Sequence, residues 1–224
     1  MEPGLYIVGT PIGNLEDMSF RAVRTLGEVD LILAEDTRKT GILLKHYEIS
    51  KPMWSCHEFN ERSRVDGVLA RIGEGKAVAL VSDAGMPLVS DPGSRLVRAV
   101  READFFCTAI PGPTAVTTAL ALSGWGQDGF VFVGFPPNKG AGRRRLLESL
   151  REESRTVVLY ESTHRIRKLF GDIEELLGER PVFMARELTK KFETARAGTA
   201  AELNAFLETH SSKGEFVVVL GPLG

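Results

Sequence analysis

Residues 81–93 read VSDAGMPLVSDPG and join an apolar run, residues 77–81, to an amphipathic segment that begins near Ser94. The run has the length of a buried strand, and the segment after it has the apolar spacing of a helix. Two Asp, two Pro and two Gly in the stretch between them predict a long loop. Because ligands of open α/β sheets bind at the carboxyl ends of strands, this loop predicts a binding site. In the alternative interpretation, Asp83 and Asp91 only cap turns.

Four other apolar runs in the first half also end in a glycine-rich or polar turn that leads into a helical segment. They are the runs 5–8, 31–34, 53–55 and 105–110, followed by GTPIGN, EDTR, CHEFN and PGPTA. Five strands that alternate with helices predict a mostly parallel sheet. Two prolines around Gly112 end the last strand, so we place the end of this N-terminal α/β domain at residue 112.

Residues 113–224 predict a second α/β domain of different composition. Its expected strands are 130–133, 156–160, 182–185 and 216–220, and a helix is expected over 143–153. The segment 186–199 has the pattern of extended chain that turns back beside a strand. Such pairing next to helical crossovers predicts a mixed sheet, and thus an α/β protein of two α/β domains.

Composition places the chain among soluble globular proteins, with 224 residues, 43% of them hydrophobic and 26% charged. Apolar runs all fall short of the ~20 residues of a membrane span, and the first strand begins too early for a signal peptide, so we expect a cytoplasmic protein. Cys56 and Cys107 lie far apart, and the histidines have no ligand spacing. These features predict neither a disulfide framework nor a metal site.

Basic residues are concentrated in one part of the chain, although the formal net charge of the whole is −2. Residues 139–191 contain 13 Lys and Arg against 9 Asp and Glu. A local basic surface favours an anionic partner such as RNA, whereas a merely solvated helix face is the alternative. The candidate RNA contacts are Lys139, Arg143, Arg144, Arg145, Arg165 and Lys190.

Eight motifs in order carry a resemblance that extends from residue 5 to about residue 220. They are TPIGN, AEDTR, VSDAGMPLVSDPG, PGPTA, GFPP before a basic cluster, YESTHR, ARELTK and GEFVVV. In this order they resemble the ribosomal RNA methyltransferase branch of the tetrapyrrole methylase-like superfamily. TPIGN alone is a weak signal, but SDAGMPLVSDPG together with YESTHR and RELTK is specific.

The resemblance implies a homodimer that binds S-adenosylmethionine in a cleft between two α/β domains. It also implies 2′-O-methylation of a cytidine ribose in 16S rRNA of the small ribosomal subunit, near the decoding centre. The implied cofactor contacts are Pro11, Ser82, Asp83, Ala84, Gly85, Met86, Thr114, Ala115, Tyr160, Ala185 and Leu188. A methyltransferase acting on tetrapyrroles or on diphthine precursors is the alternative within the superfamily. A non-catalytic module that binds RNA or a nucleotide is the alternative outside it.

Methyl transfer to a ribose hydroxyl requires a group that accepts its proton, and carboxylates at strand ends are the candidates. Asp36 is our first choice, because Arg38 beside it offers a contact for a substrate phosphate. Glu58 and Glu187 follow as further catalytic candidates. In the structural interpretation, Asp36 caps its helix and Glu187 pairs with a neighbouring arginine.

Overall fold

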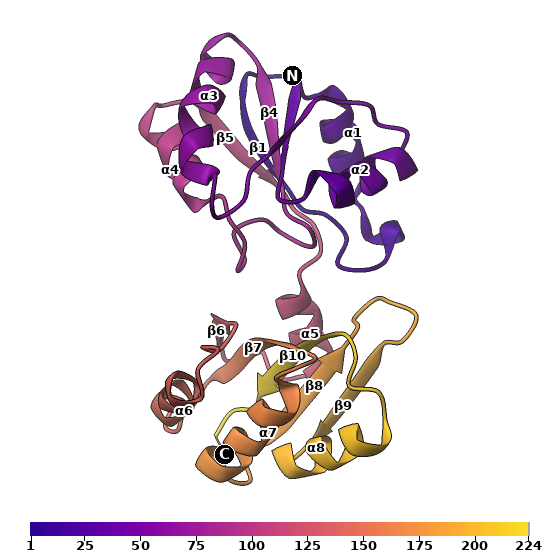
Figure 1. Cartoon of the computed structure of the whole chain (residues 1–224), viewed down its shortest axis with the longest axis vertical. Coiled ribbons are helices and arrows are strands. Elements are labelled where there is room, and N and C mark those ends of the chain that lie inside the picture. The colour runs from indigo at the N-terminus through magenta and orange to yellow at the C-terminus, as the bar shows by residue number, and fades with distance from the viewer. Residues whose placement is uncertain (224) are drawn as a thin grey trace. The chain divides into compact units, whose positions relative to one another are not determined.

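The computed structural model describes residues 1–223 and separates into two compact units, Met1–Thr114 and the remainder from Ala115. We call them unit 1 and unit 2; the sequence predicts the division two residues earlier, after residue 112. Each unit is a five-stranded sheet with helices, so the predicted α/β fold class with one parallel and one mixed sheet is confirmed (Figure 1).

The sheet of unit 1 is entirely parallel, with the strand order β3-β2-β4-β1-β5. Its strands are β1 (Gly4–Val8), β2 (Leu31–Ala34), β3 (Met53–Ser55), β4 (Ala77–Val81) and β5 (Phe106–Ile110). The helices are the 3₁₀ turn η1 (Leu15–Asp17), α1 (Phe20–Glu28), α2 (Thr37–His46), α3 (Glu61–Gly73) and α4 (Ser94–Glu102). Because all five strands run in one direction, the loops that follow them meet at one edge of the sheet.

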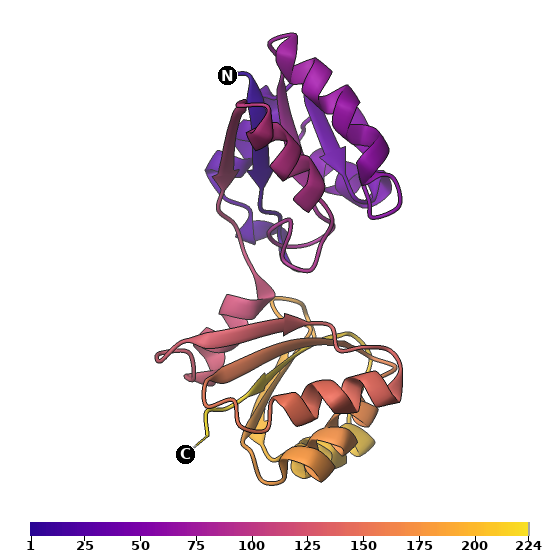
Figure 2. The same ribbon diagram turned by 90° about the vertical axis from the view of Figure 1, so that its left-hand side faces the viewer.

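Alternation along the strands of unit 1 gives two apolar faces. Val8 and Ala34 pack in the core beneath α1 and α2, whereas Leu5 and Leu33 pack in the core beneath α3 and α4. Figure 2 shows helices on both faces of this sheet. The helices therefore cover both faces and leave the carboxyl edge to the loops.

The start of α4 is fixed by a side chain from another helix. Gly93 precedes α4 and has no side chain that could cap the helix. The buried side chain of Glu61, at the start of α3, caps α4 instead. One Glu61 oxygen accepts hydrogen bonds from the amides of Arg95, at 2.7 Å, and Leu96, at 3.0 Å. A carboxylate at a helix N-terminus satisfies free amides and opposes the helix dipole. Glu61 therefore anchors the end of the 82–93 loop.

Unit 2 has the strand order β6-β7-β10-β8-β9, in which β6 and β7 are parallel and the other neighbours are antiparallel. The strands are β6 (Phe130–Gly134), β7 (Thr156–Ser162), β8 (Val182–Arg186), β9 (Thr194–Gly198) and β10 (Glu215–Leu220). The helices are α5 (Ala115–Ser123), α6 (Gly140–Ser149), α7 (Ile166–Leu177) and α8 (Ala200–Thr209). Helices α6, α7 and α8 pack on one face, and α5 contacts β10 from the other (Figure 2). The helix expected over 143–153 begins and ends a few residues earlier than predicted.

Arg180 is a buried cation that holds unit 2 together through main-chain oxygens. Its Nε donates to the carbonyl of Gly221 at 2.8 Å, and its Nη1 donates to Leu150 at 2.9 Å. Its Nη2 donates to the carbonyls of Glu153, at 2.9 Å, and Arg155, at 3.0 Å. One guanidinium thus joins the segment between α6 and β7 to the chain after β10.

None of the helices within residues 1–223 has the length and apolar character that a transmembrane span requires.

Candidate functional site

The loops after β1, β4 and β5 touch through their backbones at the carboxyl edge of unit 1. Thr10 and Gly85 form an isolated antiparallel bridge, with N–H···O distances of 2.9 and 3.1 Å. Gly9 and Gly112 lie so close that a Cβ on Gly9 would be 2.7 Å from the Gly112 Cα and 2.6 Å from the Met86 Sδ. Gly9, the first residue of the GTPIGN turn, therefore permits close packing of three loops.

Gly112→Ala should destabilise unit 1 by about 1–3 kcal/mol, the usual cost of overpacking, because its Cβ would lie 2.8 Å from the Gly9 Cα. Gly27→Ala is the matched control, since a Cβ there meets no atom within 4 Å and the residue lies in α1. That control should be neutral or up to about 1 kcal/mol more stable. Urea denaturation measures both, and equal free energies of unfolding for the two variants would contradict the packing role.

Asp83 joins the loops after β2 and β4. Its Oδ1 accepts from the amide of Asp36 at 3.0 Å, and its Oδ2 binds Lys39 Nζ at 2.7 Å. The amide of Asp83 in turn donates to Glu35 Oε2 at 3.2 Å. These contacts collect three acidic residues and one lysine at adjacent strand ends.

Asp91 lies half-buried in the same loop as Asp83, and its pKa is raised above the ordinary value. Burial and the negative charges of Glu35 and Asp83 raise the pKa of Asp91 to about 7, although a hydrogen bond with Ser82 opposes the shift. A carboxyl that titrates near neutral pH can exchange a proton during a reaction. The motif VSDAGMPLVSDPG identifies this loop as a candidate site, but it does not reveal the raised pKa of Asp91. For Asp91 the sequence predicts at most a capping role.

Both oxygens of the Asp36 side chain form hydrogen bonds with the neighbouring Arg38. Asp36 caps α2 by accepting from the Arg38 amide at 2.9 Å, and its two oxygens bind the Arg38 guanidinium at 3.0 and 2.7 Å. These hydrogen bonds hold the pKa of Asp36 well below its usual range. A carboxylate of such low basicity is a poor proton acceptor, so the geometry favours the capping alternative over our first choice of base.

The other two candidate bases have different surroundings. Glu58 is exposed in the loop 56–60 of unit 1. Glu187 lies in unit 2, where its Oε1 accepts from Lys190 Nζ at 2.9 Å and from the Glu215 amide at 3.0 Å. Burial alone would raise the pKa of Glu187, but these two hydrogen bonds lower it. Glu187 therefore stabilises the end of β8 through Oε1, and its lowered pKa makes it a weaker proton acceptor than Asp91.

The residues expected at the cofactor fall in both units. Unit 1 brings Pro11, the stretch 82–86 and Thr114 to its carboxyl edge, where Ser82 and Gly85 are buried and Ala84 is exposed. Unit 2 contains Ala115, Tyr160, Ala185 and Leu188. The Tyr160 ring packs between Phe132 and Phe135, with centroid distances of 5.0 and 5.4 Å, and Ala185 and Leu188 are buried.

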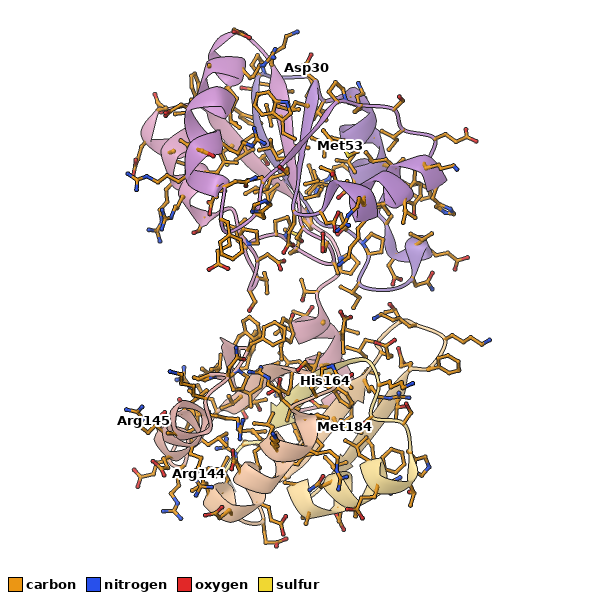
Figure 3. The ribbon with its side chains drawn as sticks, in the orientation of Figure 1. Asp30, Met53, Arg144, Arg145, His164 and Met184 are labelled. Atoms are coloured by element: carbon orange, nitrogen blue, oxygen red, sulfur yellow. The ribbon has the colours of Figure 1, made fainter. Side chains whose placement is uncertain are left out.

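The arginine cluster on α6 is not a uniform basic face (Figure 3). Arg143 is buried, and its Nε lies 2.6 Å from Asp172 Oδ2. Arg144 bridges Asp172 and Glu175, at 3.2 and 2.6 Å. Arg145 and Lys139 are exposed. The buried ion pair gives Arg143 a structural role and removes it from our RNA-contact set.

Arg165 and Lys190, the other candidate RNA contacts, also have acidic partners. Arg165 lies 2.7 Å from the fully buried Glu161 and donates to the carbonyl of Pro136 at 3.2 Å. Lys190 pairs with Glu187 and with Glu215. Both cations therefore help to hold loops of unit 2.

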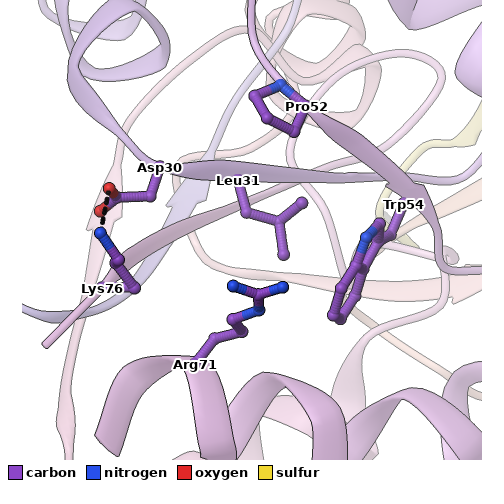
Figure 4. Close-up of a pocket in the computed structure, with 6 residues that line it drawn as sticks. All are labelled: Asp30, Leu31, Pro52, Trp54, Arg71 and Lys76. Carbon is purple, nitrogen blue, oxygen red and sulfur yellow. Dashed lines mark hydrogen bonds and ion pairs between the residues drawn. The ribbon is translucent and has the colours of Figure 1, made fainter. Parts of the chain in front are cut away.

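A shallow hollow of about 230 Å³ lies at the amino edge of the unit 1 sheet, away from these loops (Figure 4). It is lined by Asp30, Leu31, Pro52, Trp54, Arg71 and Lys76. The Asp30 carboxylate is already bound by Lys76 and by the Ala77 amide, and the Arg71 guanidinium lies 5.7 Å from the Trp54 ring centroid. We assign this hollow no role in the reaction.

Residues 4–204 match the family model described as Tetrapyrrole (Corrin/Porphyrin) Methylases. The chain belongs to the tetrapyrrole methylase family. A relative from Thermotoga maritima named "Ribosomal RNA small subunit methyltransferase I" is 49% identical over 96% of this chain and 97% of its own length. A relative of the same name from Haemophilus influenzae is 46% identical over 96% of this chain and 77% of its own.

Solved structures of methylases support the same fold at lower identity. Uroporphyrin-III-C-methyltransferase from Thermus thermophilus has a TM-score of 0.69 at 20% identity, covering 98% of this chain and 94% of that one. The methyltransferase CobJ has a TM-score of 0.71 at 18% identity with the same coverage. Methylases of this family use S-adenosylmethionine in general, and within residues 1–223 no group of His, Cys, Asp and Glu is placed to hold a metal.

Proposed function

We propose that this methylase transfers a methyl group from S-adenosylmethionine to the 2′-hydroxyl of a cytidine ribose in 16S rRNA, near the decoding centre. The names of the relatives at 46–49% identity support an rRNA substrate over a tetrapyrrole or diphthine substrate. We further propose that the protein acts as a homodimer in the cytoplasm, on the small ribosomal subunit.

The observation that carries the proposal is the acidic cluster at the carboxyl edge of unit 1. Burial, together with the negative charges of Glu35 and Asp83, raises the pKa of Asp91 at this edge to about 7. A bound cation would relieve that repulsion, and S-adenosylmethionine carries a sulfonium and an ammonium group. Ile12, which is buried, and Met86, which is half-buried, lie in the adjoining loops and suit an apolar adenine.

Asp91 is our proposed general base. S-adenosylmethionine supplies a methyl group that is already electrophilic, so the protein must orient the ribose oxygen and remove its proton. Asp91 is half-buried, and its pKa near 7 lets it accept a proton at neutral pH. The Lys39 ion pair and the Asp36 amide fix Asp83 beside it.

RNA contacts are proposed for the cations that remain exposed. In unit 2 the main proposed contacts are Lys139 and Arg145. Arg144, Arg165 and Lys190 are in ion pairs, so they contact RNA only through the N–H groups that these pairs do not use. In unit 1, the Arg38 side chain is 89% exposed beside Asp36, and Glu58 is exposed in a neighbouring loop.

From unit 2, Tyr160 and the buried Ala185 and Leu188 remain proposed contacts of the methyl donor.

The experiment is methyl transfer from labelled S-adenosylmethionine to small ribosomal subunits that lack the modification, followed by mass-spectrometric mapping of the 16S rRNA. We expect label on one cytidine ribose, and a donor-dependent rise in the thermal midpoint, because a ligand that binds only the folded state stabilises it. Label on a tetrapyrrole or a protein substrate instead would establish the alternative methylase activity. Stabilisation by the donor without label on any substrate would indicate a binding module.

A further inference from the structure

The loop between β8 and β9, residues 187–193, presents an aromatic ring to solvent. Phe192 is 65% exposed, although a phenylalanine side chain gains free energy when it is buried. Figure 1 shows this connection as a loop that extends beyond the ends of both strands. An exposed ring on such a loop is available to a binding partner.

The loop is held in one conformation by Arg186. Its Nη2 donates to the carbonyl of Phe192 at 3.0 Å, and its Nη1 donates to the carbonyl of Lys213 at 2.8 Å. The guanidinium therefore ties the ring-bearing residue to the chain before β10.

Further contacts within the loop oppose its rearrangement. The Thr189 amide donates to Glu193 Oε2 at 2.5 Å, and the Glu193 amide donates to the Lys190 carbonyl at 3.1 Å. Glu187 and Thr189 have positive φ angles, 51° and 64°, which residues other than glycine adopt only when their surroundings enforce it. A loop backbone that is ordered before binding loses little conformational entropy when a ligand contacts it.

A cation adjoins the exposed ring. The Lys191 Nζ lies 5.6 Å from the Phe192 ring centroid, and the Lys191 side chain is exposed. The acids of the loop are engaged elsewhere: Glu187 binds Lys190, and Glu193 binds the Thr189 amide. An exposed aromatic ring with an exposed ammonium group over one side of it suits a nucleotide, because the base can stack on the ring while the phosphate contacts the cation.

We propose that Phe192 stacks on an unpaired base of the RNA substrate and that Lys191 contacts the adjoining phosphate. This inference rests on the proposed rRNA substrate and assigns it a contact outside the carboxyl edge of unit 1. The sequence predicts phosphate contacts at Lys190 and Lys191 in this segment. Lys190 is engaged by Glu187 and Glu215, so the proposed contact is Lys191, and the stacking role of Phe192 is new.

The test compares Phe192→Leu with Phe192→Trp for binding to a short single-stranded RNA. Leucine keeps apolar bulk without an aromatic face and should weaken RNA affinity by about 5- to 150-fold, the range for loss of one base stack. Tryptophan should retain wild-type affinity, and RNA should quench the added indole fluorescence beyond the change seen in the wild type. Lys191→Ala should reduce the salt dependence of binding by about one unit of slope.

Wild-type affinity of Phe192→Leu, or unquenched emission of Phe192→Trp at saturating RNA, would overturn the stacking role. Altered oligomeric state of Phe192→Leu, with RNA affinity unchanged, would assign the ring to a contact between protein chains and also overturn it. Methyl transfer to small ribosomal subunits by the wild type is measured in parallel. Its absence would refute the proposed function, whereas normal transfer with unchanged binding by Phe192→Leu would refute only the stacking role.

Discussion

Asp91→Asn should lower the single-turnover rate of methyl transfer by roughly 10²- to 10⁴-fold, the usual contribution of a general base. Asparagine has nearly the shape of aspartate but cannot accept the ribose proton. Quenched-flow transfer of labelled methyl groups to small ribosomal subunits measures this rate directly.

The pH dependence of the wild type gives an independent check. Because Asp91 must be ionised to act, kcat/KM should rise as the pH rises through about 7 and then level off. The cationic donor favours the ionised carboxylate, so in the complex the pKa should be lower and kcat should level off at a lower pH. Neither ascending limb should be present in Asp91→Asn.

Stability should change in the opposite direction to activity. In the unfolded chain Asp91 ionises near its ordinary value of 3.8, but the folded protein retains the proton up to about pH 7. The wild type therefore loses stability as the pH rises through this window, and Asp91→Asn does not. Above pH 7 the variant should be more stable than the wild type, and the difference should disappear toward pH 4.

Asp36→Asn is the matched control for the activity measurement. Asparagine is a good N-cap, so α2 should remain intact, and the carboxylate that is lost is one of low basicity held by Arg38. We expect the rate to fall far less than in Asp91→Asn. A loss as large as that of Asp91→Asn would return the role of base to Asp36.

Arg180→Ala should destabilise unit 2 by roughly 3–5 kcal/mol. The substitution removes four hydrogen bonds from a buried cation and leaves the carbonyls of Leu150, Glu153, Arg155 and Gly221 without this donor. Each buried acceptor left unsatisfied costs about 1–3 kcal/mol, which partial access of water reduces. Chemical denaturation followed by circular dichroism measures the effect.

Two further variants distinguish geometry from charge at this position. Arg180→Lys keeps the charge but lacks the planar fork that reaches four carbonyls, so it should recover only part of the stability. Arg151 is exposed in the neighbouring segment, and Arg151→Ala should stay within about 0.5 kcal/mol of the wild type. Full stability of Arg180→Ala would show that the carbonyls find other partners.

The arrangement of the candidate loops could be predicted from the sequence, because carboxyl ends of parallel strands must meet at one edge. The apolar runs ending at Val8, Ala34 and Val81 define that edge, and the polar turns after them converge as expected. The sequence also contained a signal that separates the arginines of α6. Arg143, Leu147 and Leu150 are spaced four and three residues apart and share the buried face, whereas Arg145 points outward.

Other properties depend on contacts that sequence spacing does not reveal. The pKa of Asp91 depends first on its burial and then on the charge of Glu35, which lies 56 positions earlier at another strand end. The basicity of Asp36 depends on an Arg38 rotamer that donates hydrogen bonds to both of its oxygens. Side chains two residues apart do not face each other on a helix, so the spacing alone does not predict this contact. Long-range burial and rotamer choice are set by the tertiary fold, and for this reason the predicted base shifts from Asp36 to Asp91.

The strand order of unit 1 imposes a delay on folding during synthesis. Strand β1 has no neighbour close in sequence, since Gly4 pairs with Ala77 on β4 and with Phe106 on β5. At a translation rate of roughly 5–20 residues per second, the apolar β1 emerges from the ribosome about 4–15 s before β4 and about 5–20 s before β5. Until β4 emerges, the nascent chain carries an unpaired hydrophobic strand, and such exposed apolar surface is prone to aggregation.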